Sequence, residues 1–327
     1  MQWHDVIDVF NGDADGLVAR HQYRLMHPVA PEQVTLVSGV KRDIALLDRV
    51  PVTGAARRRD IQVFDISYDR NATAAATLLE DGARITYVDH HRADHLTPHP
   101  RLVAYIDESP DVCSSLLVDR LCGGKYRLWA IAAAFGDNLT AVGNRLSQEA
   151  GLSTAEAAQL SLLGECLNYN AYGESIEDLH YPPLQLAARL APYSSPLDFI
   201  AREDVLSRLK AGFDADLANA LAVRPQHASD TVAVYMLPDQ AWARRVSGAL
   251  ANRLVHDWPA RAHAVMTADA RGLATVSIRA PLSSPRDASR VALQFANSGG
   301  RAAAAGIESF SPGELPRLIE VLEETYR

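Results

Sequence analysis

Cysteine is scarce in this sequence: Cys113, Cys122 and Cys166 are the only three among 327 residues. Their number is odd and no two have the Cys-x-x-Cys spacing, which excludes a disulfide framework and a zinc ribbon. We therefore expect three buried structural thiols in the reducing environment of the cytoplasm.

Long apolar runs are also missing. No window of about 18 or more residues is apolar without interruption, and the first five residues lack the basic run and the apolar stretch of a signal peptide. The sequence therefore predicts a soluble, cytoplasmic protein with no membrane partner.

Net positive charge is missing as well, since the formal net charge is −8. Binding of long duplex DNA without regard to sequence depends on many Lys or Arg contacts to phosphate, so this charge disfavours it. A local basic pocket for a small anionic ligand stays allowed. With 48% apolar and 22% charged residues, the composition is that of an ordinary globular protein.

The pattern of the first part of the chain predicts an α/β domain. A chain of 327 residues exceeds what one core organises, so we expect two domains, with one core plus an appendage as the alternative. Short β-branched or aromatic runs, most of them separated by spacers long enough for helices, predict a mostly parallel sheet with strands at residues 6–10, 34–37, 61–64, 85–88 and 102–106. Apolar residues at helical spacing predict flanking helices at residues 114–121, 128–135, 139–150 and 154–168.

A second, smaller α/β pattern follows a connecting stretch. Pro and Tyr interrupt residues 180–196, and a charged helix is expected at residues 197–211. Beyond it we expect strands at residues 232–236, 263–267 and 274–278 and helices at residues 242–258 and 286–295. A last helix is expected after Ser311, which would be the N-cap, with Glu314 three residues later. The expected division is 1–180 for the first domain, 181–228 for a helical linker and 229–327 for the second domain.

Carboxylates follow two of the predicted strands, at the edge where ligands of α/β folds bind. Asp13 and Asp15 lie directly after the first strand in Asn11-Gly12-Asp13-Ala14-Asp15-Gly16. Alternate carboxylates on a turn can present oxygens to cations, although a surface turn explains this pair equally well. Asp65 ends the third strand and, taken alone, is better explained as a helix N-cap.

The triplet Asp89-His90-His91 ends the fourth predicted strand. A carboxylate and two imidazoles at the end of a buried strand are poorly explained as core, because unpaired Asp is rarely buried. Imidazole binds Mn, Fe, Co or Zn, and a second His is free to donate a proton or to bind phosphate. Asp137 lies between two predicted helices, where capping alone would explain it.

Together these motifs resemble the DHH family of phosphoesterases, which is named after the triplet found here at residues 89–91. Over roughly the first 170 residues, the order of the motifs matches the order in that family: Asp13-x-Asp15, Asp65, Asp89-His90-His91 and Asp137. The resemblance implies a catalytic first domain whose metal ligands are Asp13, Asp15, Asp65, His90 and Asp137, with Asp65 bridging two Mn²⁺ ions. It implies that Asp89 and His91 act on the attacking water, the outer sphere of the metals or the scissile phosphate. Mg²⁺ or Co²⁺ are alternatives to Mn²⁺.

The second domain resembles the substrate-binding domain called DHHA1, which accompanies many DHH proteins. The segment Ser298-Gly299-Gly300-Arg301-Ala302-Ala303-Ala304-Ala305-Gly306 is similar to its Gly-Gly-His-x-x-Ala-Ala-Gly loop, and residues 276–279 are similar to another substrate-contacting segment. The two-domain arrangement is that of oligoribonuclease-like and RecJ-like members. A Gly/Ala turn that packs closely on another element is the alternative explanation of the loop. The implied substrate-binding residues are Ser277, Arg279, Gly299, Gly300 and Arg301.

The sequence departs from the DHH pattern at two positions. Many members have a metal-binding His four residues before the first Asp, and that position is Val9 here. The usual His of the DHHA1-like loop is Arg301, whose guanidinium grips phosphate with two donors and stays charged. The number of metal ions and the substrate therefore stay open.

The expected function is metal-dependent hydrolysis of a phosphodiester in a short single-stranded oligonucleotide or a linear dinucleotide. The alternatives are a nucleotide phosphomonoesterase of the 3′,5′-bisphosphate type, a nucleotide-binding protein with a weakened metal site, and a substrate outside nucleic acids. A homodimer is a further open expectation. Residues 168–173 form a polar-aromatic cluster that either stacks on a base or packs as the end of a helix.

Overall fold

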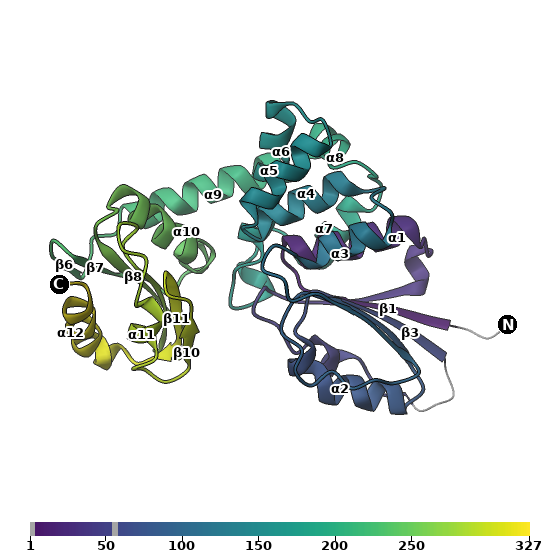
Figure 1. The fold of residues 1–327 in the computed structure, drawn as a ribbon, viewed down its shortest axis with the longest axis horizontal. Coiled ribbons are helices and arrows are strands. Elements are labelled where there is room, and N and C mark those ends of the chain that lie inside the picture. The colour runs from purple at the N-terminus through teal and green to yellow at the C-terminus, as the bar shows by residue number, and fades with distance from the viewer. Residues whose placement is uncertain (1–3, 54–57) are drawn as a thin grey trace. The chain divides into compact units, whose positions relative to one another are not determined.

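The structure is a computed structural model that describes residues 4–53 and 58–327 (Figure 1). The chain forms two compact units, residues 1–210 and 211–327, and the division between them falls within helix α9 (Val205–Leu221). Each unit has its own sheet and its own apolar core. The fold class expected from the sequence, a parallel sheet flanked by helices followed by a smaller α/β unit, is confirmed.

The first unit is built on a five-stranded sheet with the order β2-β1-β3-β4-β5, in which every pair is parallel. Its strands are β1 (His4–Phe10), β2 (Val34–Ser38), β3 (Arg58–Phe64), β4 (Arg84–Asp89) and β5 (Leu102–Ile106). Because all five run the same way, the segments that follow β1, β3 and β4 lie at one edge of the sheet, as the sequence analysis required.

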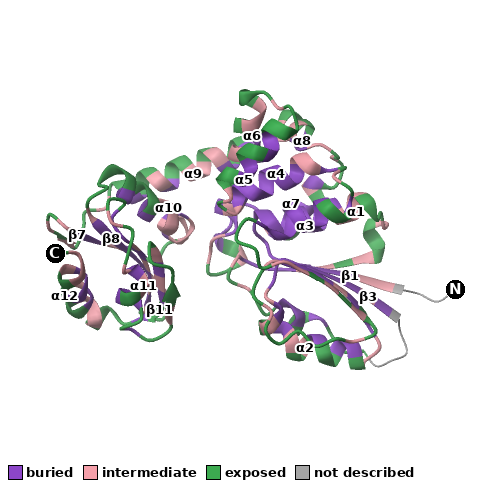
Figure 2. Cartoon of the chain, in the orientation of Figure 1, coloured by how far each residue is buried: buried purple, intermediate pink, exposed green. Residues whose placement is uncertain are grey.

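Helices cover both faces of this sheet, because its residues alternate between two cores. Phe10, Phe64 and Val88 pack with the large helical layer, whereas Val9 and its neighbours pack on the α2 side. Figure 2 shows that α3 and α4 are buried along most of their length. The helices are α1 (Ala14–Met26), α2 (Tyr68–Glu80), α3 (Ser114–Leu121), α4 (Arg127–Gly136), α5 (Thr140–Glu149), α6 (Thr154–Asn170), α7 (Pro183–Leu190) and α8 (Pro196–Arg202), with 3₁₀ turns at Pro31–Gln33, Leu46–Arg49 and Ile176–Asp178.

The stretch after residue 180 forms two short helices, α7 and α8, before α9. Helix α7 and helix α8 contribute Leu186, Leu190 and Phe199 to the core of the first unit. The single helix expected at residues 197–211 is wrong, because Glu203 leaves the helical conformation with φ −105° and ψ 146° and α9 begins only at Val205. The Glu203 carboxylate accepts hydrogen bonds from Arg189 and Tyr193, which hold it in this conformation.

The second unit contains a six-stranded mixed sheet with the order β10-β11-β9-β8-β7-β6. The pair β7–β8 is parallel and the other four pairs are antiparallel. Its strands are β6 (His227–Ala228), β7 (Val232–Leu237), β8 (Ala262–Ala268), β9 (Ala274–Arg279), β10 (Ser298–Gly300) and β11 (Ala304–Phe310), and its further helices are α10 (Ala241–Asp257), α11 (Ala288–Ala292) and α12 (Leu315–Tyr326).

Two helix boundaries in this unit differ from those expected. The helix expected at residues 286–295 is confined to α11. Asp287 has a left-handed backbone with φ 69°, so the helix cannot extend toward residue 286 and starts at Ala288. Ser311 makes no side-chain cap. A 3₁₀ turn, Pro312–Glu314, follows Ser311 instead, and α12 starts at Leu315.

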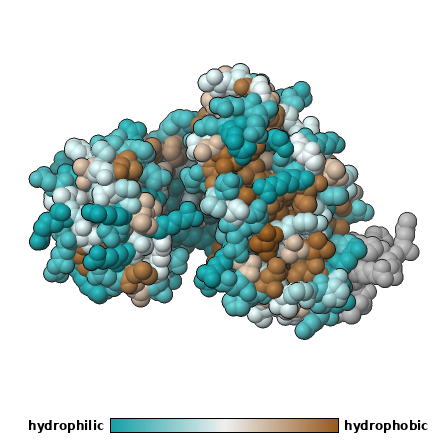
Figure 3. All heavy atoms as spheres, in the orientation of Figure 1, coloured by the Kyte–Doolittle hydropathy of each residue, from teal (hydrophilic) through white to brown (hydrophobic). Residues whose placement is uncertain are grey.

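The surface of the first unit exposes several large apolar side chains, among them Val103 and Tyr105 on the edge strand β5. On the face seen in Figure 3, apolar residues of this unit gather into a larger area than those of the second unit. Among the described helices, none combines the length and the apolar content that crossing a membrane requires.

Burial of His21 on α1 makes the stability of the first unit depend on pH. Its Nε2 lies 2.9 Å from the Tyr193 carbonyl oxygen and its ring packs edge-on against Trp129. Burial lowers the pKa of His21 to about 4 from 6.5. Above pH 6.5 His21 is neutral in both the folded and the unfolded chain, so it does not reduce the free energy of unfolding. As pH falls toward 4, the unfolded chain binds a proton that the folded chain excludes, and the free energy of unfolding decreases.

We expect this loss to amount to about 3 kcal/mol. Urea unfolding at several pH values between 7 and 4 measures it, with His21→Gln as the reference that lacks the titrating group. The free energy of unfolding of the wild type should fall more steeply than that of His21→Gln across this range. Parallel pH curves for the two proteins would contradict the assignment.

Candidate metal centre

Asp13 caps the N-terminus of α1 directly after β1. Its Oδ1 accepts the backbone N–H groups of Asp15 and Gly16, each at 3.1 Å, and Asn11 Oδ1 accepts the N–H of Asp13 at 3.2 Å. Asp13 and Asp15 are 3% and 1% exposed, so the alternative of an ordinary surface turn is wrong. The turn has to be tight here, since a Cβ at position 16 would lie 2.4 Å from the Asn11 carbonyl oxygen.

Asp15 is held by the start of α3. The N–H of Ser114 donates to its Oδ2 and the N–H of Ser115 donates to its Oδ1, both at 2.7 Å, and Ser115 Oγ donates to the Asp15 carbonyl oxygen at 2.8 Å. Unsatisfied N–H groups at a helix N-terminus favour an anion. The carboxylate is therefore fixed in orientation, and each oxygen keeps one lone pair for another partner.

Asp65 follows β3 and is 2% exposed. The alternative that it is a helix N-cap is wrong, because α2 starts at Tyr68 with Ser67 as its N-cap. The backbone of Asp65 is left-handed, with φ 59°, and its N–H donates to the Val88 carbonyl oxygen. Ser114 Oγ donates to Asp65 Oδ1 at 3.0 Å. A strained backbone conformation of this kind is typical of functional positions.

Asp137 is the C-cap of α4, its backbone N–H donating to the Ala133 carbonyl oxygen. It does not cap α5, which begins after Leu139. Gly136 allows α4 to pack closely on its neighbours, because a Cβ there would lie 2.5 Å from the Ala14 Cβ. This close packing places Asp137 next to the start of α1, although the two are separated by more than a hundred residues in the chain.

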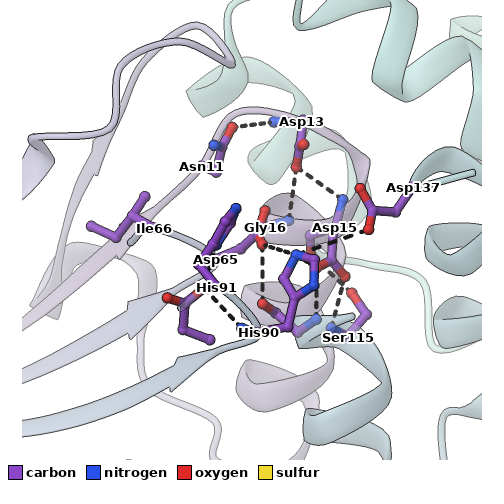
Figure 4. Close-up of polar contacts among 12 residues, drawn as sticks. Asn11, Asp13, Asp15, Gly16, Asp65, Ile66, His90, His91, Ser115 and Asp137 are labelled. Atoms are coloured by element: carbon purple, nitrogen blue, oxygen red, sulfur yellow. Dashed lines mark hydrogen bonds and ion pairs between the residues drawn. The ribbon is translucent and has the colours of Figure 1, made fainter. Parts of the chain in front are cut away.

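His90 is the point at which these carboxylates meet (Figure 4). Its Nε2 lies 3.3 Å from Asp65 Oδ1, 3.9 Å from Asp137 Oδ2 and 4.0 Å from Asp15 Oδ2. Potential ligand atoms of Asp65, His90 and His91 also lie within 4.8 Å of one another. Three of the sequence motifs thus supply oxygens around one imidazole nitrogen.

Asp89 and His91 form a pair beside this cluster. Asp89 is fully buried, and its Oδ1 accepts His91 Nδ1 at 2.6 Å and the His90 N–H at 2.9 Å. Among the described residues, none hydrogen-bonds to Asp89 Oδ2. Burial alone would lower the pKa of His91, but its hydrogen bond to Asp89 and the nearby carboxylate charges together outweigh burial and raise that pKa. The His91 side chain is 44% exposed, so its Nε2 is the nitrogen left for other contacts.

Negative charge is in excess in this cluster. Burial and then the charges of Asp15 and Asp13 raise the pKa of Asp65 well above its usual range. Burial and the charge of Asp15 raise the pKa of Asp137 to about 6. Like charges brought this close, with an imidazole between them, are favourable only when a cation neutralises them. The residues present therefore fit a divalent metal ion bound by oxygen and one nitrogen.

Lys41 belongs to this centre and was missed by the sequence analysis. It lies in the loop after β2, and its Nζ donates to Asp13 Oδ2 at 2.5 Å and to Asn168 Oδ1 at 2.9 Å. The Tyr172 ring centroid lies 5.6 Å from the same nitrogen. Burial alone would lower the pKa of Lys41, but Asp13, together with Tyr172 and Asp137, outweighs burial and raises that pKa. The signal that could have found Lys41 is its position just beyond the end of a strand next to β1.

The residues expected to bind substrate lie together on one part of the second sheet. Ser277 and Gly299 both pair with Gly306 of β11, so β9 and β10 flank the same strand. Arg279, the last residue of β9, donates from Nε to Asn252 Oδ1 at 2.7 Å.

The DHHA1-like loop itself forms the turn between β10 and β11. Gly300 needs to be glycine, because its φ is 146° and a Cβ would lie 2.4 Å from the Ala305 Cα. At Gly299 a Cβ would meet no atom within 4 Å, so close packing does not account for that glycine. Gly299, Gly300 and Arg301 are all exposed. The alternative of a closely packed Gly/Ala turn therefore explains only Gly300.

No family model matches the chain, and no curated protein matches it in sequence. Solved structures do match its fold. An exonuclease RecJ bound to manganese is 18% identical with a TM-score of 0.63, covering 98% of this chain and 89% of that chain. RecJ from Thermus thermophilus in complex with Mn²⁺ is 16% identical with a TM-score of 0.61, covering 98% of this chain and 52% of that chain. A pGpG-specific phosphodiesterase, PggH from Vibrio cholerae, is 12% identical with a TM-score of 0.54, covering 98% of each chain.

These likenesses agree with the fold class described above, a two-unit α/β protein whose first unit contains a parallel sheet. The chain shares the fold of these RecJ structures, and the two-unit α/β fold expected from the sequence is confirmed. At identities this low the likeness carries the fold and not the activity.

Proposed function

We propose that the chain is a divalent-metal-dependent phosphodiesterase that acts on short oligonucleotides or linear dinucleotides. The observation that carries this proposal is the convergence of the Asp15, Asp65 and Asp137 carboxylates on His90 Nε2, within 4.0 Å. These residues come from four separate places in the chain, and no structural need explains why like charges are gathered there. The neighbours named for exonuclease and phosphodiesterase activity support the same reaction class.

We assign Asp15, Asp65, His90 and Asp137 as metal ligands, with Mn²⁺ as the expected ion and Mg²⁺ or Co²⁺ as alternatives. Carboxylate oxygens with one imidazole suit these ions better than the thiolate sites of structural zinc. When bound, the metal supplies Lewis-acid polarisation of the phosphoryl oxygens and lowers the pKa of water. The resemblance implies two ions bridged by Asp65 and makes Asp13 a further ligand, but here Asp13 Oδ2 already accepts a hydrogen bond from the Lys41 ammonium.

We assign His91 to the reacting phosphate or its leaving group. Asp89 holds His91 Nδ1, which fixes the orientation of the ring and raises its pKa. The remaining Nε2 can then donate a proton or a hydrogen bond to a phosphoryl oxygen. Asp89 acts as a positioning residue, because it lies fully buried behind the two histidines.

We propose further that the second unit is a DHHA1-type substrate-binding domain. Its exposed Gly299 and Gly300 backbone, Ser277 and the guanidinium groups of Arg279 and Arg301 suit the phosphate or terminal nucleotide of a bound substrate.

The domain division 1–180, 181–228 and 229–327 remains a prediction beside the two compact units. A cytoplasmic location and a homodimer also remain predictions. Light scattering of the purified protein checks the homodimer.

A substrate panel tests the proposed function. Protein loaded with Mn²⁺, Mg²⁺ or Co²⁺ is incubated with short RNA and DNA oligonucleotides, pGpG and other linear dinucleotides, and nucleoside 3′,5′-bisphosphates. We expect release of mononucleotides from the oligonucleotides or dinucleotides. Absence of turnover on every substrate with all three ions would refute the phosphodiesterase.

Two alternatives give different results in the same panel. Turnover of bisphosphates alone, with release of inorganic phosphate, identifies a nucleotide phosphomonoesterase. Nucleotide binding without turnover, by protein that holds no metal, identifies a binding protein with a weakened centre. Val9 motivates the second alternative, since a buried valine replaces a metal-binding His of the resembled family.

A further inference from the structure

The Asp13 carboxylate is already engaged by the protein itself. Its Oδ1 accepts two backbone N–H groups, from Asp15 and Gly16, and its Oδ2 accepts the Lys41 ammonium at 2.5 Å. A carboxylate has about four lone-pair sites. The Asp65 side chain is a further hydrogen-bond partner of Asp13, so these groups take up most of its lone pairs. By contrast, each oxygen of Asp15 accepts a single N–H. Asp13 is the carboxylate of the centre with the least capacity to bind a metal.

Lys41 is held in this place by its backbone as well as by its side chain. Its N–H donates to the Ala171 carbonyl oxygen at 2.9 Å, and its carbonyl oxygen accepts Asn11 Nδ2 at 3.2 Å. Gly12 and Gly39 allow the loop to lie against the β1–α1 turn, since a Cβ at position 12 would be 2.0 Å from the Gly39 carbonyl oxygen. The ammonium is thus a built part of the centre, unlike a surface lysine that swings freely.

Val9 occupies the position at which the resembled family has a metal-binding His. Its side chain is fully buried in the apolar core on the α2 side of the sheet, with Ile7 and Val63. A buried isopropyl group offers no ligand atom to the centre. The chain therefore lacks the imidazole that the resembled family uses for one metal, and at the carboxylate of that same motif it places a cation of its own.

The choice of residue agrees with this role. Lys41 is one of three lysines, with Lys125 and Lys210, among 32 basic residues. Arginine is the basic residue nearly everywhere else in the chain. A lysine ammonium is a compact point charge, whereas a guanidinium is a broad planar group that favours bidentate contacts. Lysine is thus the side chain that fits where a small cation is needed.

We infer that the Lys41 ammonium takes the place of a metal ion at Asp13, so that the centre binds one divalent ion instead of two. This inference rests on the proposed metal-dependent function. The single ion is held by Asp15, Asp65, His90 and Asp137. Two of the three ammonium donors are used by Asp13 and Asn168, and the third is available to a phosphoryl oxygen of the substrate.

Metal counting on the full-length protein tests the inference. The protein is loaded with Mn²⁺ and passed through a desalting column, and its metal content and its electron paramagnetic resonance spectrum are measured. We expect about one Mn²⁺ per chain with the spectrum of an isolated ion. Lys41→Met removes the charge and frees Asp13 Oδ2, so we expect about two ions and the spectrum of an exchange-coupled pair.

Lys125→Met is the matched control, because the Lys125 ammonium also lies near an aromatic ring, that of Tyr126 at 5.2 Å, and has no part in the centre. It should bind metal as the wild type does. Lys41→Gln is made alongside Lys41→Met, and either variant suffices if the other fails to fold by circular dichroism.

Two results would overturn the inference: a wild type that holds a coupled pair of Mn²⁺ ions, or folded Lys41 variants that still hold only one. Neither result bears on whether the protein hydrolyses phosphodiesters. Conversely, a wild type that binds Mn²⁺ yet turns over no substrate refutes the proposed function while the ion count still decides the role of Lys41.

Discussion

Asp65→Asn should lower turnover of the substrate by more than about 100-fold, because even outer-sphere partners of metal ligands cost about 10–100-fold when removed. Asn is the informative replacement, since it keeps the shape of the side chain and tolerates the left-handed backbone at φ 59°. The variant loses the charge that, beside Asp15 and Asp137, makes the centre a cation site.

The same variant should be more stable than the wild type when both are free of metal. Burial among like charges raises the pKa of Asp65, so ionising this carboxyl group destabilises the metal-free protein; Asn avoids this cost, and the Tm should rise. Mn²⁺ should raise the Tm of the wild type by mass action and have little effect on Asp65→Asn. Steady-state kinetics and thermal unfolding with and without Mn²⁺ measure both effects.

Asp94→Asn is the control for this experiment, because Asp94 lies on the loop that follows the triplet and its exposed carboxylate pairs with Arg92. It should keep both the activity and the response of the Tm to Mn²⁺. If Asp65→Asn retained more than about a tenth of the activity, a loss of only about 1.4 kcal/mol, Asp65 would not be a ligand of the catalytic metal.

His91→Gln should lower kcat by about 100-fold or more, the range for loss of a positioned proton donor. Its Nδ1 is engaged by Asp89, so only Nε2 is left to act on the phosphate. The Mn²⁺ content should stay that of the wild type, because the assigned ligands are untouched. Kinetics and metal analysis of the same preparation check these two expectations together.

His95→Gln is the matched control, since His95 is 75% exposed and contacts Asp69 outside the centre. Asp89→Asn should act through His91 and cost about 10–100-fold, and the double variant should be little worse than His91→Gln alone. A loss of Mn²⁺ from His91→Gln would instead make His91 a metal ligand, which its distance to His90 and Asp65 also permits.

The local pattern of apolar and polar residues predicted much of the fold. All five parallel strands of the first unit lie where the sequence placed them, because β-branched runs between polar residues specify buried strands. The helix expected at residues 197–211 failed, since nothing local in the sequence shows that the Glu203 carboxylate accepts hydrogen bonds from Arg189 and Tyr193. Ser311 is the N-cap of a 3₁₀ turn instead of α12, and its side chain makes no capping hydrogen bond.

Motif order alone was enough to predict one shared site, because its candidates follow one another as in the resembled family: Asp13, Asp15, Asp65, Asp89, His90, His91 and Asp137. That is possible because parallel strands bring their carboxyl ends to one edge, so a residue's place along its strand predicts its place in the site.

The contacts among these side chains depend on how the helices and loops pack. Lys41 meets Asp13 across 28 residues and Asn168 across 127, and Ser115 meets Asp15 across 100. Such pairs are set by how α3, α6 and the loop after β2 pack around α1, and packing leaves no short-range trace in a sequence. The sequence therefore predicted a metal site at this edge of the sheet, whereas the fold showed that Asp13 already pairs with the Lys41 ammonium.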